Sequence, residues 1–240
     1  MHSSWVMAKN IFKASLISCL TLLTFLSPSY SEINSKVGLQ NEKSSFNVYK
    51  NFIKQELNLP ICLSMDLSII GENYIATFSA SDNIPFLDLG YTVVSKGIIE
   101  NNKLVPLETL IKDTDDEEYR STYKDNQVIV EKKLDSGYKF FNKFNSTPKD
   151  LLTIIYNFRL NDLDNFKNES TEQVYFSDKL LTLDIKLKRS GQGYAIELFK
   201  SSSTGKKERY ILCFDSNNDI LELQRIEPKS GQFKVKSKKV

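Results

Sequence analysis

The run LGYTVVSKGIIENNKLVPLETLI, from Leu89 to Ile111, holds two apolar-rich stretches joined by Asn101-Asn102. Apolar residues that alternate with polar ones are typical of a half-buried β-strand, and paired asparagines favour a tight turn. The run therefore predicts a β-hairpin made of Leu89–Ile99 and Lys103–Ile111. Most of the chain repeats this arrangement of an alternating stretch followed by a short turn.

Similar stretches recur on both sides of this hairpin, separated by short turns that are rich in glycine, asparagine, aspartate and serine. They predict ten further strands: Tyr74–Ser79, Glu118–Tyr123, Gln127–Leu134, Tyr138–Asn142, Glu172–Phe176, Leu180–Arg189, Tyr194–Phe199, Glu208–Phe214, Ile220–Glu227 and Phe233–Lys236. A spacing of about 8–12 residues between turns is typical of an antiparallel sheet that curls. The predicted fold is mainly β, with a single curled antiparallel sheet that forms an open or half barrel.

One segment in the middle of the chain has the period of a helix. Leu151, Ile154, Ile155 and Phe158 form one apolar stripe, widened by Leu152, and Lys149, Thr153 and Asn157 are predicted to face water. Thr147 is the expected N-cap, Pro148 is the expected first helical residue, and Asp150 completes a T-x-x-D capping box with Thr147. This amphipathic helix is predicted to cover the open side of the curled sheet.

The segment before the first hairpin, residues 32–85, is predicted to be an N-terminal extension of a β-rich domain at 86–240. Phe46, Tyr49, Ile53 and Leu57 follow a helical spacing behind Ser45, so a short helix is expected there, ended by Pro60. Ile61, Leu63, Met65, Leu67 and Ile69 then alternate as in a strand.

The first 31 residues have the organisation of a cleaved signal peptide. Lys9 and Lys13 precede an apolar run from Ala14 to Leu26, and small residues at Ser29 and Ser31 place the cleavage after Ser31. The run has 13 residues, which is short for a membrane span. The protein is therefore expected in the periplasm, with no transmembrane segment after cleavage.

Two alternatives to a cleaved signal peptide remain open at this end of the chain, an uncleaved membrane anchor and a lipoprotein. The LISC segment that ends at Cys19 resembles a lipoprotein acylation site, although it opens the apolar run instead of closing it. Met7 is an alternative start to Met1, since residues 1–6 add nothing to the signal pattern.

Cleavage would remove His2, the one histidine, and Lys9 and Lys13, two of the 32 basic residues. The remaining chain has 30 basic and 30 acidic residues, so no net charge favours nucleic acid as a partner. Without histidine, Ser-His-Asp and Cys-His catalysis and His-ligated metal sites are excluded. No cofactor or metal is expected, because Asp113–Glu118 is typical of a solvated loop and Asp215–Asp219 of a hairpin turn. Cys62 and Cys213 either form one disulfide or are buried thiols.

Several segments resemble a family of exported bacterial proteins catalogued as domain of unknown function 3108. They are the strand LGYTVVSKGII with Tyr91, the helix KDLLTIIYNFRL and the closing segment RYILCFDSNNDILELQRIEPKSGQFKV. The helix is similar to the family's D-x-L-x-x-x-Y-x-x-R pattern at Asp150, Leu152, Tyr156 and Arg159. The resemblance covers about residues 86–236 and implies a periplasmic β-rich fold, without an activity that could be transferred.

Arg159 follows Ile155 by four residues and so belongs at the edge of the buried stripe. It is predicted either to clamp the helix to the sheet or to bind an anionic group, with Tyr156, Asp150 and Tyr91 as the other candidate residues. The function expected from these features is that of a non-enzymatic envelope protein, which binds an apolar or lipid-like ligand in the curled sheet. The alternatives are a structural protein–protein interaction module and, third, a carboxylate-based hydrolase.

Overall fold

The structure is a computed structural model that describes residues 41–52, 55–82, 90–112, 117–145, 149–160, 169–176, 179–190, 193–201, 207–214, 220–226 and 233–237. The first half of the described chain forms eight strands: β1 (Glu42–Phe52), β2 (Gln55–Ile70), β3 (Asn73–Asp82), β4 (Tyr91–Glu100), β5 (Lys103–Lys112), β6 (Glu118–Lys124), β7 (Gln127–Leu134) and β8 (Gly137–Phe144).

The second half begins with the two-residue strand β9 (Lys149–Asp150) and the helix α2 (Leu151–Leu160). Six strands follow: β10 (Glu169–Phe176), β11 (Lys179–Ser190), β12 (Gly193–Ser201), β13 (Lys207–Phe214), β14 (Ile220–Ile226) and β15 (Phe233–Ser237). The hairpin predicted from the opening run is β4 and β5, and the ten further predicted strands all appear, with ends that differ by a few residues.

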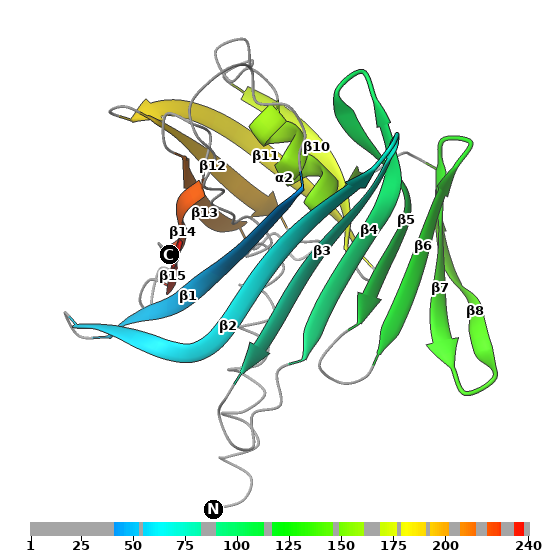
Figure 1. Cartoon of the computed structure of the whole chain (residues 1–240), viewed down its shortest axis with the longest axis horizontal. Coiled ribbons are helices and arrows are strands. Elements are labelled where there is room, and N and C mark those ends of the chain that lie inside the picture. The colour runs from blue at the N-terminus through cyan, green and yellow to red at the C-terminus, as the bar shows by residue number, and fades with distance from the viewer. Residues whose placement is uncertain are drawn as a thin grey trace, which may run out of the picture.

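All the described strands belong to one sheet, in the order β8-β7-β6-β5-β4-β3-β2-β1-β15-β14-β13-β12-β11-β10-β9 (Figure 1). Every neighbouring pair is antiparallel except β9 with β10, which is parallel. Because β1 pairs with β15, the strands nearest the two ends of the chain meet in the middle of the sheet. The two edges, β8 and β9, come from the middle of the chain.

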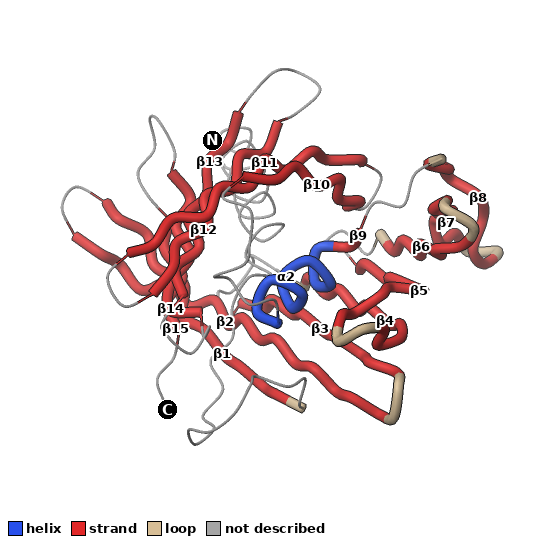
Figure 2. Tube along the Cα trace, turned by 90° about the horizontal axis from the view of Figure 1, so that it is seen from above, coloured by secondary structure: helices blue, strands red, loops and turns tan. Residues whose placement is uncertain are grey.

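The sheet curls, and α2 lies within the curl (Figure 2). Along β2, Ile61, Leu63, Met65 and Leu67 are buried, whereas between them Cys62 is exposed and Ser64 and Asp66 are half-buried. This period of two turns one apolar face of the sheet inward. Together with apolar residues of α2, that face builds one continuous core from β1–β5 and β10–β13. The predicted fold class, a curled antiparallel sheet covered by one helix, is confirmed.

The short helix predicted at the N-terminal end is wrong, because residues 42–52 form β1. Phe46 and Val48 are buried and alternate with exposed Ser45 and half-buried Asn47, so a period of two prevails over the helical spacing. Pro60 does not end an element either. It lies inside β2 where the β1–β2 register shifts, because Asn47 pairs with Cys62 and Val48 with Leu59. Such a bulge accommodates a residue that has no N–H group.

The segment predicted to be an N-terminal extension is an integral part of the sheet. Strands β1, β2 and β3 lie between β15 and β4 in the strand order. The boundary expected after residue 85 therefore does not coincide with a break in the sheet.

The helix begins at Leu151, three residues after the predicted start, and the expected cap Thr147 and first helical residue Pro148 lie outside the described residues. Lys149 and Asp150 are in β9 instead, and Asp150 caps the helix. The predicted apolar stripe is buried. The expected face toward water is confirmed at Lys149 but wrong at the other two positions, because Thr153 is fully buried and Asn157 is half-buried. The helix is enclosed because it packs against β3, β5, β9 and β10.

Candidate functional site

Four polar side chains meet at the start of α2, inside the curled sheet. Asp150 Oδ1 accepts a hydrogen bond from the backbone N–H of Thr153 at 3.0 Å. Asp150 Oδ2 accepts one from the Ser95 hydroxyl at 2.9 Å and another from the Thr153 hydroxyl. Asp150 is 1% exposed, so protein groups satisfy both of its oxygens in place of water.

Tyr74, on β3, completes this buried polar cluster of Tyr74, Ser95, Asp150 and Thr153. Its hydroxyl lies 3.0 Å from Ser95 Oγ and 3.1 Å from Thr153 Oγ1. The cluster thus joins β3, β4 and the first turn of α2 through side chains alone. A fully bonded network of this kind fixes the position of the helix, since moving it would leave buried polar groups unpaired.

The pKa values of both ionisable members of the cluster, Asp150 and Tyr74, are raised. Burial raises the pKa of the Asp150 carboxyl above its ordinary value, although hydrogen bonds from Thr153 and Ser95 oppose the shift. Burial, and then the charge of Asp150, raise the pKa of the Tyr74 hydroxyl. A carboxyl in this setting is enclosed by its own protein and presents no free oxygen to a substrate.

Asn157 fastens the other end of the helix to β5. Its Oδ1 accepts a hydrogen bond from the backbone N–H of Leu104 at 2.7 Å, and its Nδ2 donates one to the backbone oxygen of Leu104 at 2.9 Å. The side-chain amide therefore pairs with the strand much as a neighbouring backbone would. The helix is held at two points, at the buried polar cluster and at Asn157.

The buried polar cluster and Asn157 together form the helix anchor. The predicted site residues lie mainly in this anchor and in the core. Asp150 is in the buried polar cluster, and Tyr156 is a buried residue of α2. Tyr91 is buried on β4, and its ring meets that of Phe78 edge-on, with 6.2 Å between centroids. Arg159 lies in α2, but its side chain is outside the described residues, so the choice between clamp and anion site stays a prediction.

Sequence reasoning missed Tyr74, Ser95, Thr153 and Asn157 as members of the helix anchor. Thr153 and Asn157 lie four residues apart, a spacing that from the sequence alone predicts a solvent face. Tyr74 and Ser95 carried no local signal, because their role depends on strand register. Tyr74 pairs with Gly97, two residues along β4 from Ser95.

Cys62 and Cys213 do not form the disulfide considered from the sequence. Cys62 is exposed on β2, and Cys213 is half-buried on β13, which is four strands along the sheet.

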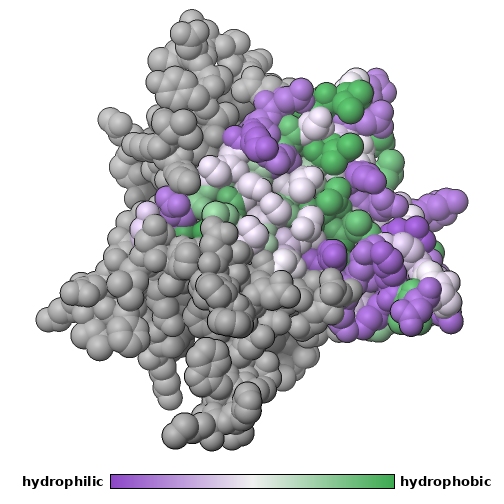
Figure 3. Space-filling view, turned by 60° about the horizontal axis from the view of Figure 1, so that its bottom comes forward, coloured by the Kyte–Doolittle hydropathy of each residue, from purple (hydrophilic) through white to green (hydrophobic). Residues whose placement is uncertain are grey.

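A second feature, the outer wing, consists of β6, β7 and β8, at one edge of the sheet (Figure 1). It has a small core of its own, formed by Tyr119, Val128 and Val130 with Tyr123 and Phe144 against them. Apolar side chains nevertheless remain exposed on and beside it: Leu107, Ile129, Leu134, Phe140 and Phe141. Figure 3 shows apolar residues lying among charged ones on the described surface.

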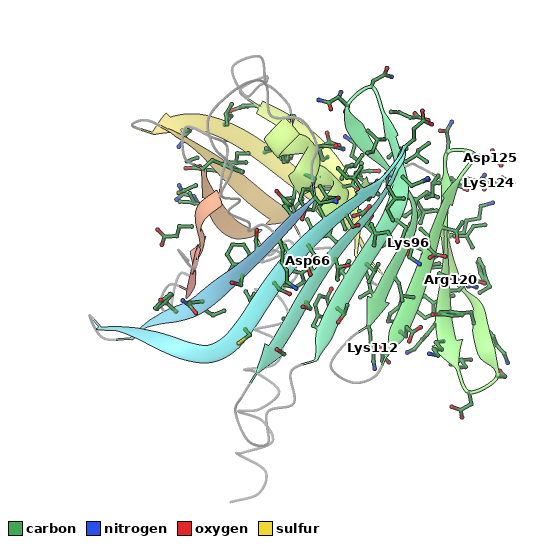
Figure 4. The ribbon with its side chains drawn as sticks, viewed as in Figure 1. Asp66, Lys96, Lys112, Arg120, Lys124 and Asp125 are labelled. Atoms are coloured by element: carbon green, nitrogen blue, oxygen red, sulfur yellow. The ribbon has the colours of Figure 1, made fainter. Side chains whose placement is uncertain are left out.

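Ion pairs run across one face of the outer wing. Arg120 lies 2.8 Å from a Glu131 oxygen, and its guanidinium is 4.1 Å from the centre of the Tyr138 ring. Lys133 lies 3.0 Å from Glu118, which also accepts a hydrogen bond from the Tyr138 hydroxyl. That hydrogen bond lowers the pKa of Glu118. Figure 4 labels Arg120 on β6, Lys112 on the neighbouring strand β5 and Lys96 on β4.

Comparison with known proteins gives a fold but no family. No family model matches the chain, and no curated protein matches it. A β-barrel-like protein of domain of unknown function DUF1849 from Brucella abortus is similar in structure, with a TM-score of 0.52 and 8% identity over 85% of this chain and 98% of that one. The resemblance to domain of unknown function 3108 stays a prediction.

A second solved structure, of the CurJ dehydratase, has a TM-score of 0.16 and 11% identity over 82% of this chain and 75% of that one, so it carries no argument. Within the described residues, no helix has both the length and the apolar character needed to cross a membrane. Because the Brucella protein is only 8% identical to this chain, its similarity supports the barrel-like fold alone.

Proposed function

We propose that this chain is an exported, non-enzymatic protein-interaction module of the bacterial cell envelope. The observation that carries the proposal is a contrast between the inside of the curled sheet and the outer wing. The inside of the curl is occupied by a firmly anchored helix, whereas large apolar side chains are exposed on the outer wing.

The inside of the curl supports a scaffold role. Leu152, Ile155 and Tyr156 of α2 are at most 2% exposed, and they share one core with both halves of the sheet. Thr153 and Asn157 of the helix are bonded to the sheet rather than directed into an open space. A packed interior of this kind stabilises the fold and leaves the outer surfaces for recognition.

The outer wing supports an interaction role. Phe140 is 68% exposed and Phe141 is 43% exposed, on adjacent positions of an edge strand. Exposed apolar residues that gather on one region, among charged residues, are typical of protein-binding surfaces. The ion-paired residues around them would form the polar rim of such a surface.

Site-specific photo-crosslinking in a bacterial host tests this function. A photoreactive phenylalanine analogue would replace Phe140 in one variant and Ile70, which is 67% exposed on β2, in a matched control. We expect a discrete crosslinked product from position 140, identified by mass spectrometry, and none of the same mass from position 70. Equal products from both positions, or none, would contradict the proposal.

The export step rests on residues 1–31, which lie outside the described residues. The intact mass of the protein from a periplasmic fraction tests it, and we expect a chain that begins at Glu32. A lipid-modified chain that begins at Cys19 would replace this proposal with the lipoprotein alternative.

A second candidate function is the binding of an apolar or lipid-like ligand within the curl. It is favoured by the apolar inner face of β1–β3, whose buried residues include Phe46, Met65 and Phe78. Native mass spectrometry of the purified protein separates the two candidates. A reproducible extra mass that is extracted by organic solvent would favour the ligand carrier, and a clean protein mass would favour the interaction module.

A further inference from the structure

We propose that β8 is a docking edge for an extended partner segment whose short apolar run is flanked by carboxylates on both sides. The partner segment would add to the sheet as one more strand beside β8. This inference rests on the proposed function, and it names the site and the chemistry of the partner.

The first argument is the backbone of β8. Among the described strands, β8 pairs with β7 alone and stands at the end of the sheet. An edge strand has a row of N–H and C=O groups that no neighbour uses, and extended peptides bind such rows by adding a strand. With eight residues, β8 is long enough for a short segment.

The second argument is the pair of aromatic residues at the centre of this edge. Phe140 pairs with Glu131 on the ion-paired face of the wing. Phe141 is the extra residue at a register shift, and its ring meets that of Tyr119 with 5.6 Å between centroids. The two rings therefore offer apolar contacts on both faces, where the side chains of an added strand would lie.

The third argument is the charge around these rings. Lys139 precedes them and Lys143 follows them, and β8 has no acidic residue. In the described part of the chain neither lysine forms an ion pair, while the nearby carboxylates are already paired. Glu131 is bonded to Arg120, Glu118 to Lys133, and Glu117 to Lys132.

The resulting order along β8 is cation, two aromatic rings, cation. A second copy of this chain would bring the same lysines to the edge, and like charges on neighbouring strands are destabilising. A segment with an apolar centre and carboxylates at both ends matches this order. Lysines on the edge thus disfavour self-pairing and favour an acidic partner strand.

The test uses the whole protein and a defined probe. The probe is a fluorescent peptide with capped ends and the sequence Glu-Asp-Val-Ile-Val-Glu-Asp. One control peptide replaces each acidic residue by lysine. Another carries N-methyl groups on the consecutive backbone nitrogens of its central Val-Ile-Val, so that it keeps its charge but has no N–H group to pair with on either edge of its centre. Fluorescence anisotropy would measure binding of each peptide.

We expect the acidic probe to bind and both control peptides to bind at least about tenfold more weakly. Lys139→Glu with Lys143→Glu should weaken binding by about tenfold or more, since two attractions become repulsions. Lys103→Glu with Lys124→Glu, two exposed lysines away from β8, is the matched control and should change binding less than about twofold. Circular dichroism would verify that both variants fold.

Three results would overturn the inference: no binding of the acidic probe, equal binding of the N-methylated peptide, or equal effects of the two double variants. Crosslinking from position 140 distinguishes this failure from failure of the proposed function. If position 140 crosslinks a defined partner while the probe does not bind, the docking mode is wrong and the interaction module stands. If both fail, the proposed function is wrong as well.

Discussion

The carboxyl of Asp150 is buried at the start of α2, and burial raises its pKa. In the unfolded chain this carboxyl ionises near its ordinary pKa of about 3.9. As the pH rises above that value, the unfolded state loses its proton before the folded state does. The contribution of Asp150 to stability is therefore greatest in acid and decreases as the pH rises toward the folded pKa.

The Asp150→Asn variant has no proton to lose at this position and keeps a side chain that can cap a helix. We expect the free energy of unfolding of the wild type, relative to this variant, to fall as the pH rises from about 4 to 7. Urea unfolding at several pH values would measure it, with Asp125→Asn in an exposed turn as the control. A difference that stays constant or grows with pH would contradict the role assigned to Asp150.

Gly97 is a second residue with a specific structural role, because its surroundings leave no space for a side chain. A Cβ atom at this position would lie 2.0 Å from the backbone oxygen of Val105 and 2.8 Å from Cε1 of Tyr74. The register also shifts here, between Lys96 and Gly97. Gly97 therefore lets the Tyr74 ring lie across β4, where its hydroxyl reaches the buried polar cluster.

Gly97→Ala is expected to destabilise the fold by about 1–3 kcal/mol or more, because backbone and a buried ring would have to move. Gly90→Ala is the matched control, since a Cβ there meets nothing within 4 Å. Thermal unfolding of both variants would measure the difference. An equal effect of the two substitutions would show that the close approach at Gly97 does not matter.

At the scale of single elements, α2 is stabilised by apolar packing on almost every side. Ile155 is fully buried within the core. We expect Ile155→Ala to cost about 2–5 kcal/mol of unfolding free energy, from lost burial and a residual cavity. Lys149→Ala, which removes an exposed ion pair with Glu172, should cost less than about 1 kcal/mol. Comparable losses in the two variants would contradict this account of the helix.

The strands could be predicted from the sequence because each carries its own alternation and its own turn. Asn101, Asn102, Asp125 and Asn126 adopt positive φ angles, as tight turns between paired strands require. The helical stripe was predictable for the same reason, since its period is local. The prediction of a helix around Phe46 was wrong because its few apolar residues fit both a helical period and the period of two of a strand. Pairing with β2 and β15 makes the segment a strand.

The buried polar cluster could not be predicted, because it depends on strands and a helix that are far apart in the chain. Tyr74 and Thr153 are 79 residues apart, and their hydroxyls meet only when β3, β4 and α2 are assembled. A polar residue on an amphipathic helix is predicted to face solvent unless its hydrogen-bond partner in the sheet is known. Sequence patterns therefore identified the elements, and packing determined which of their polar residues are buried.

For the whole molecule, the pairing of β1 with β15 joins the two halves of the chain. The sheet runs from β8 to β1 and then continues from β15 to β9, so this pair is its central seam. β15 forms five residue pairs with β1 and four with β14. At about 1 kcal/mol for each backbone hydrogen bond, these pairs contribute an amount comparable to the total stability of about 5–15 kcal/mol that is usual for a domain.

A chain that ends at residue 232 would lack β15 and leave β1 and β14 as new edges. We expect it to lose the single cooperative unfolding transition, because the two halves would no longer share one hydrogen-bonded sheet. A chain that ends at Ser237 keeps β15 and should unfold like the full chain, so it is the matched control. Urea unfolding followed by circular dichroism and tyrosine fluorescence would measure both. If the chain ending at residue 232 retained the midpoint and slope of the control, the central seam would not be what unites this fold, and the core shared by α2 and the inner faces of the sheet would have to do so alone.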